Sequence, residues 1–241
     1  MKKHMKMTIE ANKNILVVAP HPDDESIGCG GLLKLYGKQT DILLLTDGRK
    51  GGCSYCNNET ELIQLRKEEF LSAAEYAGVR HTFFLNIPEG TLRKSYQTIK
   101  NFSFSNYDYI FVPNKYESHH DHADTFTMIK KCIKRNKQKL FQYEVWTPLR
   151  YPTHYLDITD VMDHKEFMIG KYKSQLEAVD YPGRIKGLNR YRAIRNPKDD
   201  AASGYGEAYE LTASSFYHTA SLVYHELPYH LKAVLEKFFS V

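Results

Sequence analysis

Long hydrophobic runs are missing from this sequence. No segment approaches the roughly 20 consecutive apolar residues of a spanning helix, so we expect no membrane span. Residues 1–10 are basic, but they run straight into an apolar segment far shorter than the hydrophobic core of a signal peptide. Both absences favour a cytoplasmic protein.

A charge excess of either sign is missing as well. The 33 Lys and Arg residues nearly balance the 29 Asp and Glu residues, which leaves a formal net charge of +4. No basic run with interleaved aromatic residues stands out. We expect no nucleic-acid partner, because such partners are bound through concentrated positive charge.

Cysteine is scarce, with residues only at positions 29, 53, 56 and 132. Four cysteines in a chain of 241 residues do not indicate a disulfide framework. Cys53-x-x-Cys56 has the spacing of half a structural zinc site or of a redox pair, yet no second pair of matching spacing completes a zinc site. We expect two ordinary loop thiols.

Internal repeats and low-complexity segments are also absent, and the length suits one α/β domain with an ample core. We expect a single domain over residues 1–241. Its motif-bearing part covers residues 14–210. Residues 211–241 are predicted to form a C-terminal packing or association segment, which would suit a homo-oligomer.

The most informative stretch is residues 19–31, with the sequence APHPDDESIGCGG, directly after the apolar run Ile15–Val18. A short aliphatic run followed by Pro, His, acids and glycines is typical of a buried strand that ends in a loop and continues as a helix. In open α/β sheets, ligands bind beyond the carboxyl ends of the strands. This loop is therefore placed where a binding site is expected.

Three adjacent acids in that loop need an explanation. Asp23, Asp24 and Glu25 would repel each other and lose hydration beside a strand end, unless a cation neutralises them or they stay in water. His21 and Asp24 provide an imidazole and a carboxylate, both of which divalent transition metals accept as ligands. Two such ligands do not complete a site.

A second group of candidate ligands, His119-His120-Asp121-His122, follows another apolar run, Tyr109–Val112. This run also reads as a strand, so the group lies at a second strand end. Two strand ends of one sheet would bring the first loop and one of the later histidines onto a single metal ion.

The segment after the first loop allows two interpretations. Residues 28–36 predict a helix and residues 41–48 a strand with its turn, which together indicate a βαβ unit in a parallel sheet. A dinucleotide-binding fold has the same order, and Asp47 stands near the position of its ribose-binding acid. However, the glycines do not have the G-x-G-x-x-G spacing, and the acids at 23–25 would repel a pyrophosphate.

The rest of the chain continues the α/β pattern. Strands are predicted at 81–85, 108–112, 141–146 and 155–158, and helices at 62–77, 123–133 and 165–179. Gly78 should cap the first of these helices, and His122 should lie in the first turn of the second. Residues 181–206 are predicted as a long irregular loop, either a lid over the site or a partly disordered segment.

Together, His21-Pro22-Asp23-Asp24-Glu25 and His119-x-Asp121-His122 resemble the LmbE/PIG-L family of zinc-dependent N-deacetylases, which remove acetyl groups from N-acetylglucosaminyl compounds and related amides. Partial matches to further family patterns are Thr46-Asp47-Gly48, Arg66-x-x-Glu69, the Lys165-to-Gln175 helix and Gly204–Glu210. The resemblance implies a Rossmann-like three-layer α/β fold with a mostly parallel sheet, and a metal site at the carboxyl ends of the strands.

The resemblance also implies the metal chemistry. His21, Asp24 and His122 would be the zinc ligands, and Fe²⁺ would suit the same two-nitrogen, one-carboxylate set. Asp23 would be the general base that accepts a proton from the attacking water. Glu25 would lie behind these residues and support them.

By the same resemblance, His119 would supply positive charge to the oxyanion if it is protonated, and Asp121 would orient that imidazole. Either Asp23 or His119 could protonate the leaving amine. His120 is expected to face outward.

Three residues are candidate substrate contacts. Arg66 would either reach the polar head of the substrate or form an exposed pair with Glu69, which would contribute little to stability. Arg192 belongs to an arginine-rich stretch that would suit a phosphate, a nucleotide diphosphate or a carboxylate on the sugar. Tyr205 or Tyr116 would replace the tyrosine that some family members use near the oxyanion.

We therefore expect a zinc-dependent hydrolase that removes the N-acetyl group from an N-acetylglucosamine-type sugar or sugar conjugate. One alternative is a zinc amidase for another N-acyl compound, such as an antibiotic precursor or a thiol conjugate. A metal-binding module without turnover is the other, although Asp23 argues against it because zinc binding does not need this residue.

Overall fold

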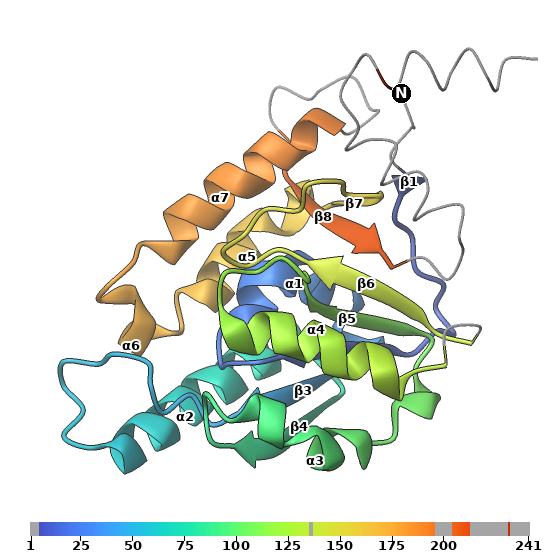
Figure 1. The fold of residues 1–241 in the computed structure, drawn as a ribbon. Coiled ribbons are helices and arrows are strands. Elements are labelled where there is room, and N and C mark those ends of the chain that lie inside the picture. The colour runs from blue at the N-terminus through green and yellow to red at the C-terminus, as the bar shows by residue number, and fades with distance from the viewer. Residues whose placement is uncertain (1–4, 135–136, 196–203, 213–230, 232–241) are drawn as a thin grey trace, which may run out of the picture. The chain divides into compact units, whose positions relative to one another are not determined.

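The computed structural model describes residues 5–134, 137–195, 204–212 and 231 (Figure 1). Residues up to Leu211 form the compact unit that carries all predicted site residues. From residue 213 on, and apart from Leu231, the predicted C-terminal packing segment lies outside the described residues.

A sheet of eight strands, in the order β1-β7-β8-β6-β5-β2-β3-β4, forms the centre of this unit. Its strands are β1 (Met5–Lys6), β2 (Ile15–Ala19), β3 (Thr40–Thr46), β4 (His81–Ile87), β5 (Tyr109–Pro113), β6 (Lys139–Tyr143), β7 (His154–Asp157) and β8 (Gly206–Leu211). Every pairing is parallel except those that β8 makes with β6 and β7. The predicted mostly parallel sheet is confirmed.

Helices cover both faces of the sheet. They are α1 (Asp24–Tyr36), α2 (Glu59–Ala77), α3 (Tyr96–Lys100), α4 (His120–Cys132), α5 (Met162–Ile169), α6 (Lys173–Leu176) and α7 (Tyr181–Arg192). Figure 1 shows α4 in front of the strands and α1 behind them. Among the described residues, no helix combines the length and apolar character needed to cross a membrane.

Strand β2 explains the three layers. All five of its residues are buried, as expected for a parallel strand covered on both faces. Ile15, Val17 and Ala19 join the core beneath α1, α2 and α5, whereas Leu16 and Val18 join the core beneath α3 and α4. The alternation of a strand thus divides one apolar run between two cores.

The position of β2 also determines where the loops meet. It pairs with β3 on one side and with β5 on the other, and Val17 lies opposite Phe111 of β5. From β2 the chain proceeds outward through β3 and β4, and from β5 it proceeds in the other direction to β6. This is the switch point of an open α/β sheet, where ligands bind beyond the strand ends.

Two predicted elements differ from the structure. The helix predicted over residues 165–179 is two helices, α5 and α6, because Tyr172 turns inward between them and its hydroxyl donates to Glu25. The loop predicted over residues 181–206 is wrong for residues 181–192, which form α7. The carboxylate of Asp180 caps that helix by accepting from the backbone N–H of Gly183.

Helix α1 is held by a buried carboxylate from β8. Glu207 accepts from the backbone N–H groups of Gly31 and Leu32 at 2.7 and 2.9 Å, and from Lys165 Nζ of α5 at 2.7 Å. The side chains of Lys165 and Glu207 are each 1% exposed. Close packing of α1 on β6 also requires Gly28, because a Cβ atom there would collide with the Tyr143 ring.

We predict that Lys165→Met lowers the free energy of unfolding by about 3–5 kcal/mol, because it leaves the Glu207 carboxylate buried without its cation. Urea denaturation checks this. Lys186→Met is the matched control, since Lys186 pairs with Glu166 near the surface and its loss should cost under about 1 kcal/mol. Equal losses for the two variants would contradict the prediction.

Candidate metal centre

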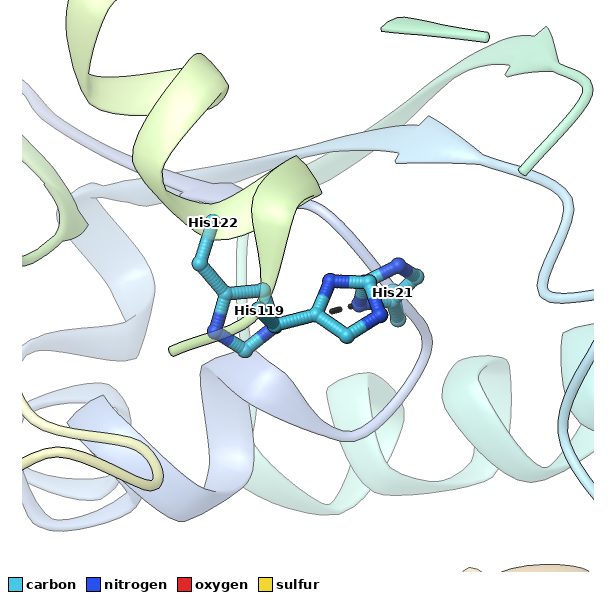
Figure 2. Close-up of side chains that lie close together, drawn as sticks. All are labelled: His21, His119 and His122. Atoms are coloured by element: carbon cyan, nitrogen blue, oxygen red, sulfur yellow. Dashed lines mark hydrogen bonds between the residues drawn. The ribbon is translucent and has the colours of Figure 1, made fainter. Parts of the chain in front are cut away.

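Two loops at the carboxyl edge of the sheet carry the predicted ligands. His21 lies two residues after β2, and Asp24 is the first residue of α1. His122 lies in the first turn of α4, as predicted, because that helix begins at His120. Figure 2 shows the imidazoles of His21, His119 and His122 gathered in one place.

The ligand atoms form a nearly equilateral triangle. His21 Nδ1 lies 3.1 Å from Asp24 Oδ2 and 3.2 Å from His122 Nε2, and those two atoms lie 3.2 Å apart. Zinc binds nitrogen and oxygen at about 2.0–2.1 Å, so the ligands of a tetrahedral site lie about 3.3 Å from each other. The triangle therefore fits one ion and leaves a fourth position open.

The charges around the triangle favour a cation. Burial alone would lower the pKa of His21, but hydrogen bonds to Asp121 and Asp24 raise it to about 9. Burial also opposes charge on His122, whereas Asp24 and Glu117 raise its pKa to about 10. The carboxylates thus stabilise positive charge between these side chains. They would stabilise a metal ion bound in place of the protons in the same way.

Two other groups of potential ligands also contain His21. One adds His119 and His122, and the other adds Glu89 and Asp121, with ligand atoms within 4.8 Å of one another. On the Glu89 side, His21 Nε2 lies 3.7 Å from Glu89 Oε1 and 3.3 Å from Asp121 Oδ2. We favour the triangle because all three of its edges are 3.1 or 3.2 Å.

Asp121 orients a different imidazole from the one expected. Its carboxylate contacts His21 Nε2 and accepts from the backbone N–H of Gly90 at 3.0 Å. The hydrogen bond to His119 comes instead from the backbone N–H of Asp121, which donates to His119 Nδ1 at 3.2 Å. A carboxylate on Nε2 places the proton of His21 there and leaves the Nδ1 lone pair for the triangle.

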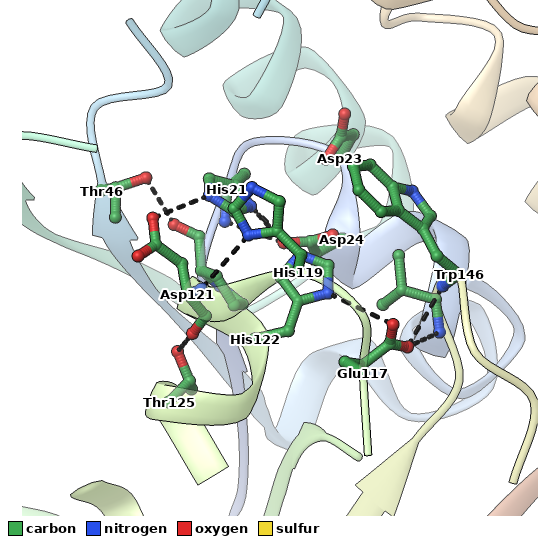
Figure 3. A network of polar contacts seen from close by, with 12 residues as sticks. His21, Asp23, Asp24, Thr46, Glu117, His119, Asp121, His122, Thr125 and Trp146 are labelled. Atoms are coloured by element: carbon green, nitrogen blue, oxygen red, sulfur yellow. Dashed lines mark hydrogen bonds and ion pairs between the residues drawn. The ribbon is translucent and has the colours of Figure 1, made fainter. Parts of the chain in front are cut away.

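Glu117 is a site residue that the sequence did not reveal. Its Oε2 lies 3.8 Å from His122 Nδ1, and its Oε1 accepts backbone N–H groups from Val145, Trp146 and Thr147 at 3.0–3.1 Å (Figure 3). No spacing rule links Glu117 to the motif that follows it, because its partners come from the segment after β6.

Asp23 is held in a strained position beside the triangle. Its φ of 128° and ψ of −32° are rare for a residue with a side chain, and such conformations cost of order 1–3 kcal/mol. Glu25 supports it by accepting its backbone N–H at 3.2 Å. Burial is the main cause that raises the pKa of Asp23 to about 7, and the charge of Arg66 opposes it.

Arg66 does not form the exposed pair considered from the sequence. Its side chain is 3% exposed, and Nη2 donates to Asp23 Oδ2 at 3.2 Å and to the carbonyl of Pro22 at 2.8 Å. Glu69 accepts from the backbone and hydroxyl of Ser174 instead. The arginine thus positions the carboxylate of the expected base.

The other predicted substrate contacts have protein partners. Arg192 donates to the Glu144 carboxylate and to the carbonyl of Leu149, and its side chain is 11% exposed. The ring of Tyr205 lies beside Lys186 and Arg190, which belong to α7. These contacts explain how α7 is held, and they supply no argument for substrate binding.

His119 caps α4, and its electrostatics differ from the expectation. Burial and the charges of His21 and His122 lower its pKa, so the neutral imidazole is favoured over the protonated form. Because Nδ1 accepts from the backbone of Asp121, the proton of the neutral ring lies on Nε2. His120, the next residue, is exposed, as expected.

Two further residue groups singled out from the sequence have defined contacts in the structure. Asp47, the acid of the dinucleotide interpretation, binds the Arg49 guanidinium at 2.6 Å and the backbone N–H of Glu89 at 3.2 Å. Cys53 and Cys56 are half-buried free thiols whose sulfur atoms lie 2.6 Å apart.

Comparison with known proteins identifies similar sequences. Residues 16–133, which contain every triangle residue, match the model of the PIG-L family, described as GlcNAc-PI de-N-acetylase. A Bacillus cereus protein named probable N-acetyl-alpha-D-glucosaminyl L-malate deacetylase 2 is 25% identical over 210 residues, which cover 72% of this chain and 90% of that protein. Diacetylchitobiose deacetylase of Thermococcus kodakarensis is 28% identical over 68% of this chain and 70% of its own length.

A solved structure shares the fold. N,N'-diacetylchitobiose deacetylase from Pyrococcus horikoshii, complexed with its inhibitor MPG, superposes with a TM-score of 0.71 at 24% sequence identity. The match covers 86% of each chain.

We predict that a divalent metal ion at about 100 times its Kd raises the melting temperature of chelator-treated protein by about 5–10 °C, since binding of this strength contributes about 2.7 kcal/mol. Differential scanning calorimetry with Zn²⁺ and Fe²⁺ measures the shift. His122→Ala should abolish it, whereas His120→Ala on the exposed side of the same turn should keep it. A full shift in His122→Ala would remove this residue from the site.

Proposed function

We propose that this chain, whose residues 16–133 match the PIG-L family model, is a metal-dependent hydrolase that removes the N-acetyl group from an N-acetylglucosamine-type sugar or sugar conjugate. The observation that carries the proposal is the triangle of His21, Asp24 and His122 with the Asp23 carboxylate beside it. Metal binding alone gives no reason for a strained, buried acid at that position.

Zn²⁺ is the proposed ion, held by two imidazoles and one carboxylate, and Fe²⁺ suits the same donors. When bound, such an ion lowers the pKa of a coordinated water toward about 7 and polarises the amide carbonyl. The carboxylate of Asp121 fixes the imidazole of His21 for this purpose, and the Glu117 carboxylate faces Nδ1 of His122 at 3.8 Å.

Asp23 is the proposed general base. The Arg66 guanidinium donates to its carboxylate, and the Glu25 carboxylate accepts its backbone N–H. A general base works best when its pKa lies near the operating pH. Burial raises the pKa of Asp23 toward that range. It takes the proton of the attacking water as the water adds to the acetamide carbon.

His119 is proposed to stabilise the oxyanion as a neutral donor. Its Nδ1 is occupied by the backbone N–H of Asp121, so its Nε2–H is the atom available to the substrate oxygen. That assignment leaves Asp23 as the residue that carries a proton, and Asp23 is therefore proposed to pass it to the leaving amine.

The names of the relatives support the substrate class. The Bacillus cereus relative is named for a glucosaminyl malate and the Thermococcus kodakarensis relative for diacetylchitobiose, so both names contain an N-acetylated glucosamine unit. Arg192 is already paired with Glu144, so we infer no phosphate on the sugar from it. An amidase for another N-acyl compound is the alternative, and a substrate panel separates the two.

We predict that Asp23→Asn lowers kcat for acetate release from N-acetylglucosamine or N,N'-diacetylchitobiose by about 10²–10⁴-fold, because it removes the proton acceptor. Metal content, measured by atomic emission, should stay the same. Asp160→Asn, at an exposed acid, is the control and should keep full activity.

Normal turnover by Asp23→Asn would refute the assignment of the base. If the wild-type protein, loaded with metal, releases acetate from neither sugar but hydrolyses other N-acyl amides, the sugar substrate falls and the amidase alternative stands.

A further inference from the structure

The chain contains a single tryptophan, and it lies beside the metal triangle. The Trp146 ring centroid is 5.4 Å from that of His119, edge-on, and 5.6 Å from that of His122. Nevertheless, Trp146 is 51% exposed. A tryptophan that is half exposed forgoes much of the stabilisation that burial of its side chain would give. This exposure favours a role for Trp146 in binding.

The backbone of Trp146 is fixed relative to the metal ligands. Its N–H donates to Glu117 Oε1 at 3.1 Å, and Oε2 of the same buried carboxylate faces His122 Nδ1 at 3.8 Å. The neighbouring N–H groups of Val145 and Thr147 donate to Glu117 as well. Figure 3 shows Glu117 between His122 and the backbone of Trp146. Glu117 therefore holds the backbone of Trp146 close to His122.

The exposed part of the indole is mostly apolar. The Trp146 side chain carries one polar group, the indole N–H, and this group only donates. The rest of its exposed surface is apolar carbon.

We propose that Trp146 is the platform on which the pyranose ring of the substrate stacks. A pyranose ring is polar at its rim and presents C–H groups on its face, and an exposed aromatic ring complements such a face. The imidazoles of His119 and His122, with ring centroids 5.4 and 5.6 Å from that of the indole, lie close enough to receive a 2-acetamido substituent of a stacked ring. This inference rests on the proposed function for the identity of the reacting group.

A small ligand explains the exposed indole better than a protein partner does. Protein interfaces use contiguous apolar patches, whereas the rings adjacent to Trp146 are the polar imidazoles of His119 and His122. Tyr116, another exposed aromatic residue, has the Lys115 ammonium over its ring instead. A single aromatic platform beside a polar cluster is typical of sites for small ligands.

Intrinsic fluorescence tests the platform directly, because all tryptophan emission comes from Trp146. Metal-loaded Asp23→Asn, which should bind without turnover, is titrated with N-acetylglucosamine, N,N'-diacetylchitobiose and the acyclic N-acetylethanolamine. We expect a saturable blue shift with both sugars and a much smaller response to the acyclic amide. Flat emission at sugar concentrations that saturate the enzyme overturns the proposal.

Kinetics of Trp146→Ala and Trp146→Phe provide the second test. Stacking of this kind corresponds to about a tenfold change in affinity, so Trp146→Ala should raise KM for the sugars about tenfold or more with kcat little changed. Trp146→Phe should recover most of the loss. For N-acetylethanolamine, kcat/KM should stay within about twofold of wild type. Phe167→Ala, at an exposed aromatic of α5, is the matched control and should leave both KM and kcat unchanged.

The outcomes separate this inference from the proposed function. If sugars shift the emission but the wild-type protein releases no acetate, the stacking role of Trp146 is supported and the proposed hydrolysis is contradicted. If Trp146→Ala hydrolyses the sugars with unchanged KM, the proposed hydrolysis is supported and the stacking role of Trp146 is contradicted. Equal losses for cyclic and acyclic amides would show that Trp146 only supports the fold around Glu117, which also overturns the platform.

Discussion

Strands β2 and β5 run parallel and side by side, so the loops that leave them meet at one edge of the sheet. Every contact in the metal triangle crosses between these two loops or lies within the first of them. An edge of 3.2 Å leaves no room for a shift of one residue in the register of the strands, because neighbouring residues point to opposite faces. The pairing of two apolar runs thus determines the geometry of a polar site.

The buried charges around the triangle are each held by a specific donor. Backbone N–H groups after β6 hold Glu117, the N–H of Gly90 holds Asp121, and the Arg66 guanidinium holds Asp23. Buried carboxylates are costly without such partners, and with them they become rigid. A site built this way needs little reorganisation when charge develops during a reaction, which is the condition for strong electrostatic catalysis.

The sequence predicted the parts of the molecule that follow from local patterns. Apolar runs gave the strands, Gly78 marked the end of α2 with a φ of 73°, and His122 lies in the first turn of α4. The sequence did not predict contacts between residues that are distant along the chain. It missed Glu117, whose hydrogen-bond donors lie after β6. It also did not show that Glu69 binds Ser174 and leaves Arg66 to other partners. Helix α7 was missed although Asp180 and the following proline are typical of a helix start, because its glycines and arginines suggested a loop.

The place of β8 within the sheet has a consequence for how the chain folds. This strand is the last one described along the chain, yet it lies between β7 and β6, and it alone joins β1 and β7 to the other strands. While the protein emerges from the ribosome, β1 and β7 must therefore wait for residues beyond 205 before they gain a neighbour in the main sheet. The same strand brings Glu207 to α1, so the helix that begins with Asp24 gains this anchor only after Glu207 has been synthesised. A chain that ends before Glu207 would lack the buried carboxylate that holds the backbone of α1.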